Sequence, residues 1–96
     1  MAVNKKIVTD VLNYIGAEAK SGWYVGIATN AKNRLFQDHK VDEKNGYWIY
    51  QEASSETDAR DTETYLLNNY FFKGGTGGGD NPRYVYAYKI TLETRE

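Results

Sequence analysis

Hydrophobic residues near the start of the chain recur at the spacing of a helix. The residues at this spacing are Ile7, Val8, Val11, Leu12 and Ile15. Polar side chains lie on the opposite face, which is typical of an amphipathic helix that packs on a core. We expect this helix to end either near Gly16 or within residues 20–22.

The pattern changes to the alternation of a strand over residues 23–28. The bulky face of this strand consists of Trp23, Val25 and Ile27. The opposite face presents Tyr24 beside Gly26. Because a glycine weakens a strand, it often marks a close approach of backbone or ligand. This second face is therefore the first candidate for a site.

The same reasoning predicts two further helices. A short helix over residues 31–39 begins after Thr29 or Asn30, either of which can cap it. A longer helix begins after Ser54 or Ser55 and continues to about residue 70.

Two further strands are predicted, over residues 47–50 and 84–90, so helices and strands alternate along the chain. This order is typical of an α/β protein, here a small three-stranded sheet flanked by about three helices, with the C-terminal strand joining the sheet. The order and direction of the strands stay open. We expect a single domain. Its parts are an N-terminal helical segment over residues 1–21, a core over 22–90 and a tail over 91–96.

Residues 73–82 are dominated by glycine, which predicts a flexible connector. Successive glycines can also form a nest that binds an anion. The phosphate-loop signature is absent, however, and a strand follows where that motif requires a helix. The functional alternative is a flap that closes over a substrate.

Composition narrows the class of protein. The chain is 41% hydrophobic and 26% charged, which predicts a folded, soluble domain, and no apolar run is long enough for a membrane span. Without cysteine there is no disulfide or thiolate metal site, so we expect a cytoplasmic protein. A net charge of −1 argues against nucleic-acid binding by bulk electrostatics. The nine tyrosines indicate either an aromatic core or a recognition surface.

Glu63 lies within the apolar stripe of the longer predicted helix. The other members of that stripe are Ala59, Leu66, Leu67 and Tyr70. A buried carboxylate without a partner is costly, so we expect Glu63 to be paired, hydrogen-bonded or bound to a metal. The alternative is a glutamate at the helix edge that pairs with Arg60 or reaches water.

Three more residues could complete a chemical site. Arg34 alone is typical of a solvated helix, and His39 alone is typical of a helix end. Together with Tyr24 and Glu63 they supply the parts that phosphodiester cleavage needs. A carboxylate can hold a hard divalent cation. An arginine can meet the charge that develops on phosphate oxygens, and a tyrosine or histidine can take a proton from water.

A series of residues between positions 22 and 79 follows the order of a known signature. The residues are Tyr24-Val25-Gly26, Thr29-Asn30, Arg34-Leu35, His39, the strand over 47–50, Ala59 and Glu63. This set resembles the second half of the GIY-YIG endonuclease signature. The resemblance implies a small α/β nuclease acting on DNA. It also implies one divalent ion, Mg²⁺ or Mn²⁺, held by Glu63, with Arg34 aiding the transition state and with Tyr24 and His39 near the attacking water.

The sequence departs from that family in its first motif, because a predicted helix replaces the Gly-Ile-Tyr strand. We hypothesise that Tyr86 or Tyr84, on the C-terminal strand, takes the place of the missing tyrosine. Tyr86 is then expected to lie with Gly26 on the substrate side of the sheet. His39 also follows Arg34 by five residues, whereas a spacing of four would place both on one helix face.

Three functions are compatible with these residues. The first is a metal-dependent nuclease that hydrolyses DNA. The second is a catalytically inactive relative that binds a nucleic acid or a protein partner. The third is a structural module without metal, in which Glu63 affects stability alone.

Overall fold

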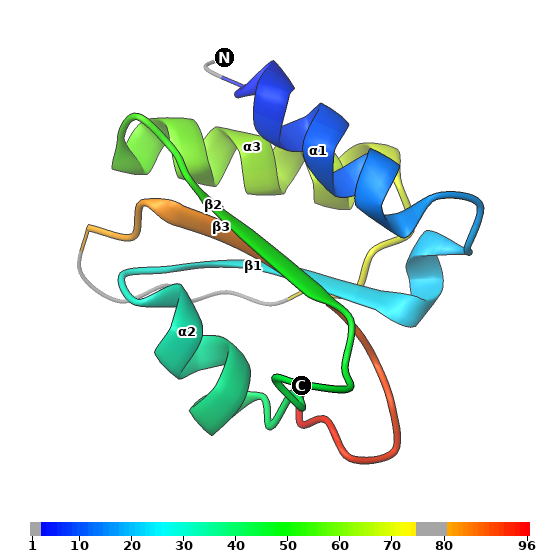
Figure 1. Ribbon diagram of the computed structural model, residues 1–96. Coiled ribbons are helices and arrows are strands. Elements are labelled where there is room, and N and C mark those ends of the chain that lie inside the picture. The colour runs from blue at the N-terminus through cyan, green and yellow to red at the C-terminus, as the bar shows by residue number, and fades with distance from the viewer. Residues whose placement is uncertain (1–2, 75–80) are drawn as a thin grey trace.

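An antiparallel sheet of three strands separates two layers of helices in the computed structural model, which describes residues 3–74 and 81–96 (Figure 1). The helices on one face are α1 (Lys5–Ile15) and α3 (Glu56–Asn69). The other face is covered by α2 (Ala31–Asn33), which continues as a π-helical turn over Arg34–Asp38. The predicted α/β class, with a small sheet and three helices, is confirmed.

The strands are β1 (Trp23–Ala28), β2 (Trp48–Glu52) and β3 (Tyr84–Lys89). Their order in the sheet is β1-β3-β2, and β3 is antiparallel to both neighbours. The C-terminal strand therefore joins the sheet as predicted, and it does so at the centre. The register places Gly26 opposite Tyr86 on one side of β3 and Tyr50 opposite Tyr86 on the other.

The alternation predicted for β1 divides the core into two clusters. Trp23, Val25 and Ile27 face α1 and α3 together with Val85 and Ala87 of β3. The opposite face carries a second cluster that is rich in aromatic rings, formed by Tyr24, Ala28, Leu35, Val41, Tyr86 and Tyr88. Every residue of β1 is buried. Both faces of the sheet are thus covered, which requires the hydroxyl groups on the aromatic face to find partners inside the protein.

The helix boundaries follow the local signals. The Asn4 side chain caps α1, which ends at the first of the two predicted positions because Gly16 adopts a φ of 68° there. Asn30 and Ser55 cap α2 and α3, each accepting a hydrogen bond from the backbone N–H three residues later. A short 3₁₀ helix occupies Lys20–Gly22, the second predicted position.

The start of the glycine-rich segment pairs with β1, which corrects the prediction of a flexible connector at that point. Lys73 donates its N–H to Trp23 and accepts one from Val25, both at 2.9 Å, and so covers the outer edge of β1. The hypotheses of an anion-binding nest and of a flap over a substrate depend on residues 75–80, which lie outside the described residues. No helix of the described chain is long and apolar enough to span a membrane.

Asp58 joins the start of α1 to the start of α3. Its carboxylate accepts hydrogen bonds from the Asn4 side chain at 2.9 Å and from the backbone and hydroxyl of Ser54 at 3.2 and 3.0 Å. The Asn4 hydrogen bond holds the pKa of Asp58 below its usual value, against the effect of burial. In the same contact, the Asn4 N–H donates to the Thr62 hydroxyl at 2.8 Å.

We expect Asp58→Ala to lower the free energy of unfolding by about 1–3 kcal/mol, because three donors lose their acceptor. Urea denaturation followed by circular dichroism measures this change. Glu56→Ala is the matched control, since it removes a carboxylate from the same helix turn but loses only an ion pair with Arg60 on the surface. Equal effects of the two substitutions would contradict this account.

Candidate functional site

The hydroxyl of Tyr86 is the point at which the predicted site residues meet. It lies 2.7 Å from Nε2 of His39. The guanidinium of Arg34 lies beside the same hydroxyl. The Tyr24 ring completes the group, with its centroid 4.7 Å from that of His39 and a stacked arrangement on Tyr86. The residues therefore converge on one phenol, which comes from the strand furthest along the chain.

Gly26 makes this arrangement possible. A Cβ at this position would lie 2.6 Å from the Tyr86 hydroxyl oxygen and 2.7 Å from the ring carbon that carries it. The Tyr86 ring therefore crosses β1 in the space that a side chain would occupy. The predicted close approach at Gly26 is real, but the approaching group is a side chain rather than backbone or ligand.

A π-helical turn brings Arg34 and His39 to the same region. The His39 N–H donates to the Arg34 carbonyl at 2.8 Å, a bond across five residues. The extra residue in this turn accommodates the spacing of five, so both side chains reach Tyr86 without a spacing of four. His39 lies at the end of this turn, as expected of a helix-end histidine, and it is only 5% exposed. The Arg34 Nε is also buried, and it has no hydrogen-bond partner among the described residues.

Both ring nitrogens of His39 are hydrogen-bonded. Nδ1 lies 2.7 Å from the carbonyl oxygen of Arg95 and 3.0 Å from the Tyr88 hydroxyl. Since a carbonyl can only accept, Nδ1 carries the hydrogen and Nε2 accepts one from Tyr86. Burial lowers the pKa of His39, and the charge of Arg34 contributes in the same direction. The lowered pKa favours the neutral imidazole, with its basic nitrogen toward the Tyr86 phenol.

Burial raises the pKa of Tyr86, and Tyr24 adds to this effect. Arg34 acts in the opposite direction because its positive charge favours the phenolate. The negative charge of Glu63 also raises the pKa of this phenol, and it is the smallest of these effects.

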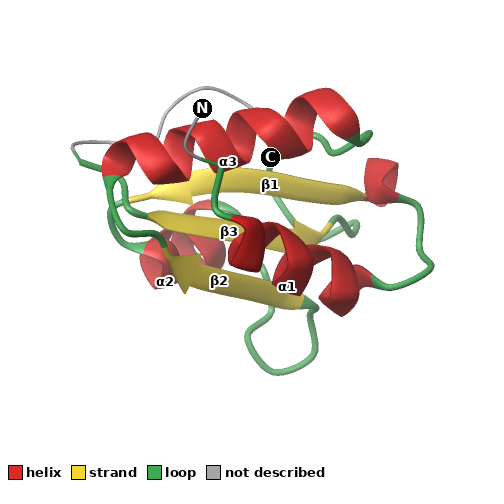
Figure 2. Ribbon diagram, turned by 90° about the horizontal axis from the view of Figure 1, so that it is seen from above, coloured by secondary structure: helices red, strands yellow, loops and turns green. Residues whose placement is uncertain are grey.

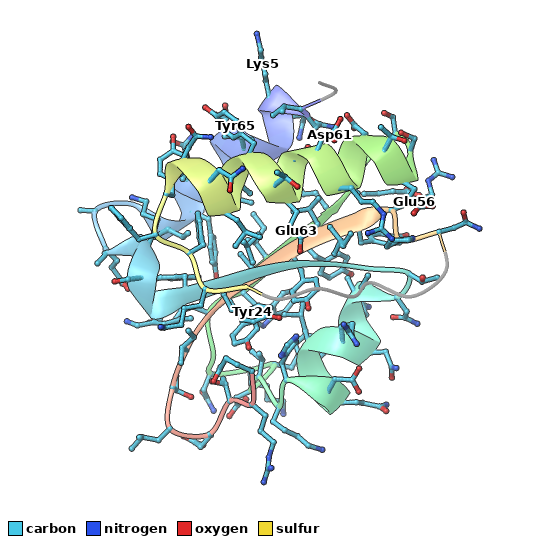
Figure 3. The ribbon with its side chains drawn as sticks, turned by 180° about the vertical axis from the view of Figure 1, so that it is seen from behind. Lys5, Tyr24, Glu56, Asp61, Glu63 and Tyr65 are labelled. Atoms are coloured by element: carbon cyan, nitrogen blue, oxygen red, sulfur yellow. The ribbon has the colours of Figure 1, made fainter. Side chains whose placement is uncertain are left out.

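Glu63 reaches this region from the other face of the sheet. In Figure 2, α3 runs along β1, the outer strand. Figure 3 shows Glu63 pointing from α3 toward that strand, with Tyr24 beyond it. Burial raises the pKa of Glu63 to about 7, although Arg60 opposes the shift. The carboxylate forms no hydrogen bond or ion pair with another described residue, so the predicted pairing with Arg60 is restricted to a longer-range attraction.

Of the two tyrosines named in that hypothesis, Tyr86 lies in the cluster, whereas Tyr84 packs on Tyr50. Sequence reasoning missed three contributors to the site, which are Tyr88, Arg95 and Glu96. The alternation of β3 gave a signal for Tyr88, since it places that residue on the same face as Tyr86. Nothing in the local pattern indicates that Arg95 contacts His39.

The fold and the cluster define a small α/β protein in which a buried tyrosine–histidine pair lies beside a partly exposed arginine and a half-buried carboxylate. Comparison with known proteins gives no match to any family model, curated protein or solved structure. Within residues 3–74 and 81–96 there is no group of three or more His, Cys, Asp or Glu side chains that could hold a metal. A cation here would have Glu63 as its protein ligand.

We expect Glu63→Gln to stabilise the protein at pH 8 by about 1 kcal/mol and to have little effect at pH 5. The raised pKa means that the folded state binds the Glu63 proton more tightly than the unfolded state. The stability that the bound Glu63 proton contributes is therefore fully present below pH 4.5, and it is lost as the pH rises through about 7. Denaturant titrations at both pH values measure the change. Glu56→Gln, on the same helix, controls for loss of a carboxylate, and a destabilising effect of Glu63→Gln at pH 8 would contradict the prediction.

Gly26→Ala should lower the free energy of unfolding by about 1–3 kcal/mol, because the Tyr86 ring must move. The same movement should break the hydrogen bond to His39, which NMR of the only histidine can follow. Gly22→Ala is the matched control, since a Cβ there meets no atom within 4 Å. If both substitutions behave alike, Gly26 is not required for the approach of the ring.

Proposed function

We propose that the protein is a GIY-YIG-like nuclease that hydrolyses phosphodiester bonds in DNA with a divalent metal ion. The observation that carries this proposal is the convergence of His39, Arg34 and Tyr24 on the Tyr86 hydroxyl. These groups supply a base, a cation for phosphate and a stacked phenol at one place. The position of Tyr86 beside Gly26 supports the hypothesis that the C-terminal strand supplies the tyrosine of the missing first motif.

Glu63 fits the role of a metal ligand. Its oxygens are hard donors, and they have no competing hydrogen-bond donor among the described residues. Mg²⁺ and Mn²⁺ suit such a site, because Mg²⁺ usually keeps several waters and needs few carboxylates. When bound, the ion would polarise the phosphodiester and lower the pKa of a bound water.

The other residues have separate roles in the proposed reaction. The Tyr86 oxygen takes a proton from the attacking water while its own proton passes to Nε2 of His39, so His39 ends as an imidazolium. Arg34 meets the negative charge that develops on the phosphate oxygens. Tyr24 stacks on the Tyr86 ring and contacts the His39 ring at a tilt, which holds both rings in place.

One observation favours the second function, an inactive module that binds a nucleic acid or a protein partner. Tyr86 is only 1% exposed, so its hydroxyl is closed to a substrate in this conformation. A hydroxyl that stays sealed would serve packing alone. The two functions differ in whether the protein cleaves DNA or only binds a partner.

Incubation with plasmid and branched DNA in the presence of Mg²⁺ or Mn²⁺ is expected to produce cleavage that a chelator prevents. Glu63→Gln should abolish cleavage, and Arg34→Ala should reduce kcat by about 100-fold through loss of charge stabilisation. Glu56→Gln, a carboxylate change on the same helix, should leave the rate unchanged.

Absence of cleavage with every DNA, or full activity of Glu63→Gln, would overturn the nuclease proposal. Salt-dependent DNA binding without cleavage would then support the second function. An effect of Glu63→Gln on stability alone would support the metal-free structural module.

A further inference from the structure

The segment after β3 returns beneath the sheet to the end of the α2 region (Figure 1). Two hydrogen bonds made by the main chain of Arg95 connect it to one residue of that region. The Arg95 N–H donates to the His39 carbonyl, and the His39 Nδ1–H donates to the Arg95 carbonyl, both at 2.7 Å. The histidine is thus held by its backbone and by its ring at the same point of the segment.

Glu96 extends this contact through a second residue. Its carboxylate accepts hydrogen bonds from the Tyr88 hydroxyl at 3.1 Å and from the Thr94 hydroxyl at 2.8 Å. A Tyr88 hydroxyl that donates to Glu96 has its oxygen free to accept from Nδ1 of His39, which lies 3.0 Å away. Each group then donates a hydrogen bond to the next, from Tyr86 to His39, from His39 to Tyr88 and from Tyr88 to Glu96.

The opposite tautomer conflicts with these contacts. A hydrogen on Nε2 instead of Nδ1 would direct the Nδ1 lone pair at the carbonyl oxygen of Arg95, 2.7 Å away. It would also make Tyr88 donate to His39 and leave the Glu96 carboxylate without that donor. The carbonyl and the carboxylate therefore select the same tautomer independently.

We propose that residues 94–96 are a positioning element of the site, which holds His39 as the Nδ1–H tautomer and directs its Nε2 lone pair to Tyr86. The catalytic consequence rests on the proposed nuclease function, whereas the tautomer does not. In the proposed reaction His39 gains the Tyr86 proton on Nε2, while its Nδ1–H stays hydrogen-bonded to the carbonyl of Arg95. The Glu96 charge then stabilises the imidazolium through Tyr88.

Several groups surround His39 and bear on its titration. The charged ones are Arg34 and Asp38 from the α2 region and Glu96 from the segment, and the phenols are Tyr24, Tyr86 and Tyr88 from the sheet. The hydrogen bond to the Arg95 carbonyl raises the pKa of His39, and the charges of Asp38 and Glu96 add to it, against the effects of burial and Arg34. Removal of the Glu96 charge should therefore lower it.

Because the chain has a single histidine, ¹⁵N-labelled protein reports its tautomer without ambiguity. Long-range ¹H–¹⁵N correlation spectra at pH 7.5 should show Nδ1–H in the unmodified chain and in Arg95→Ala, which keeps both main-chain bonds. Arg95→Pro removes the N–H that holds His39 and should give a mixture of tautomers. An unmodified chain with hydrogen on Nε2, or an unchanged tautomer in Arg95→Pro, would overturn the proposal.

Glu96→Gln provides a second test that leaves the backbone intact. The pKa of His39 should fall relative to the unmodified chain, and the difference should shrink as salt is added. An unchanged pKa overturns the role of Glu96. In the nuclease assay, Arg95→Pro should reduce kcat and leave KM unchanged. If the unmodified chain cleaves no DNA, the nuclease proposal fails, while the tautomer spectra still decide the positioning role.

Discussion

The hydroxyl of Tyr86 imposes the main constraint on this structure. It is buried on the central strand, and an unsatisfied hydroxyl there would cost roughly 1–3 kcal/mol. The protein satisfies it with His39, which requires the π-helical turn after α2, and makes space for the ring with Gly26. His39 in turn needs an acceptor at its other nitrogen, which the backbone of Arg95 supplies. One buried polar group thus determines the conformation of three separate segments.

Local pattern predicted much of the fold, because helices and strands depend on residues close in sequence. The alternation of β1 assigned both of its faces correctly, and the capping residues of α1, α2 and α3 lie where side-chain chemistry favours them. The strand order needed information from residues far apart, such as the pairing of Gly26 with Tyr86. The contact between Arg95 and His39 is of the same kind. No periodicity encodes either one.

The site illustrates the difference between order along a chain and neighbourhood in space. Tyr24, Arg34, His39 and Glu63 were proposed as a set because their order along the chain resembles a known signature. The tyrosine that joins them was proposed only as one of two, since Tyr84 and Tyr86 alternate onto the same face of β3. Register decides between them, because only Tyr86 lies opposite the residue without a side chain. Pairing in a sheet depends on which strands lie side by side, whichever part of the chain they come from.

The central position of β3 has a consequence for synthesis on the ribosome. Strands β1 and β2 both pair with β3 and not with each other, while the outer edge of β1 pairs with Lys73. A nascent chain that has not yet released residues 84–89 from the exit tunnel therefore cannot join β1 to β2, and the edge of each strand that pairs with β3 stays open. Closure of the sheet must wait for contacts of high sequence separation, which slows folding and makes it cooperative. Chaperones would meet this protein as an incomplete sheet until β3 emerges.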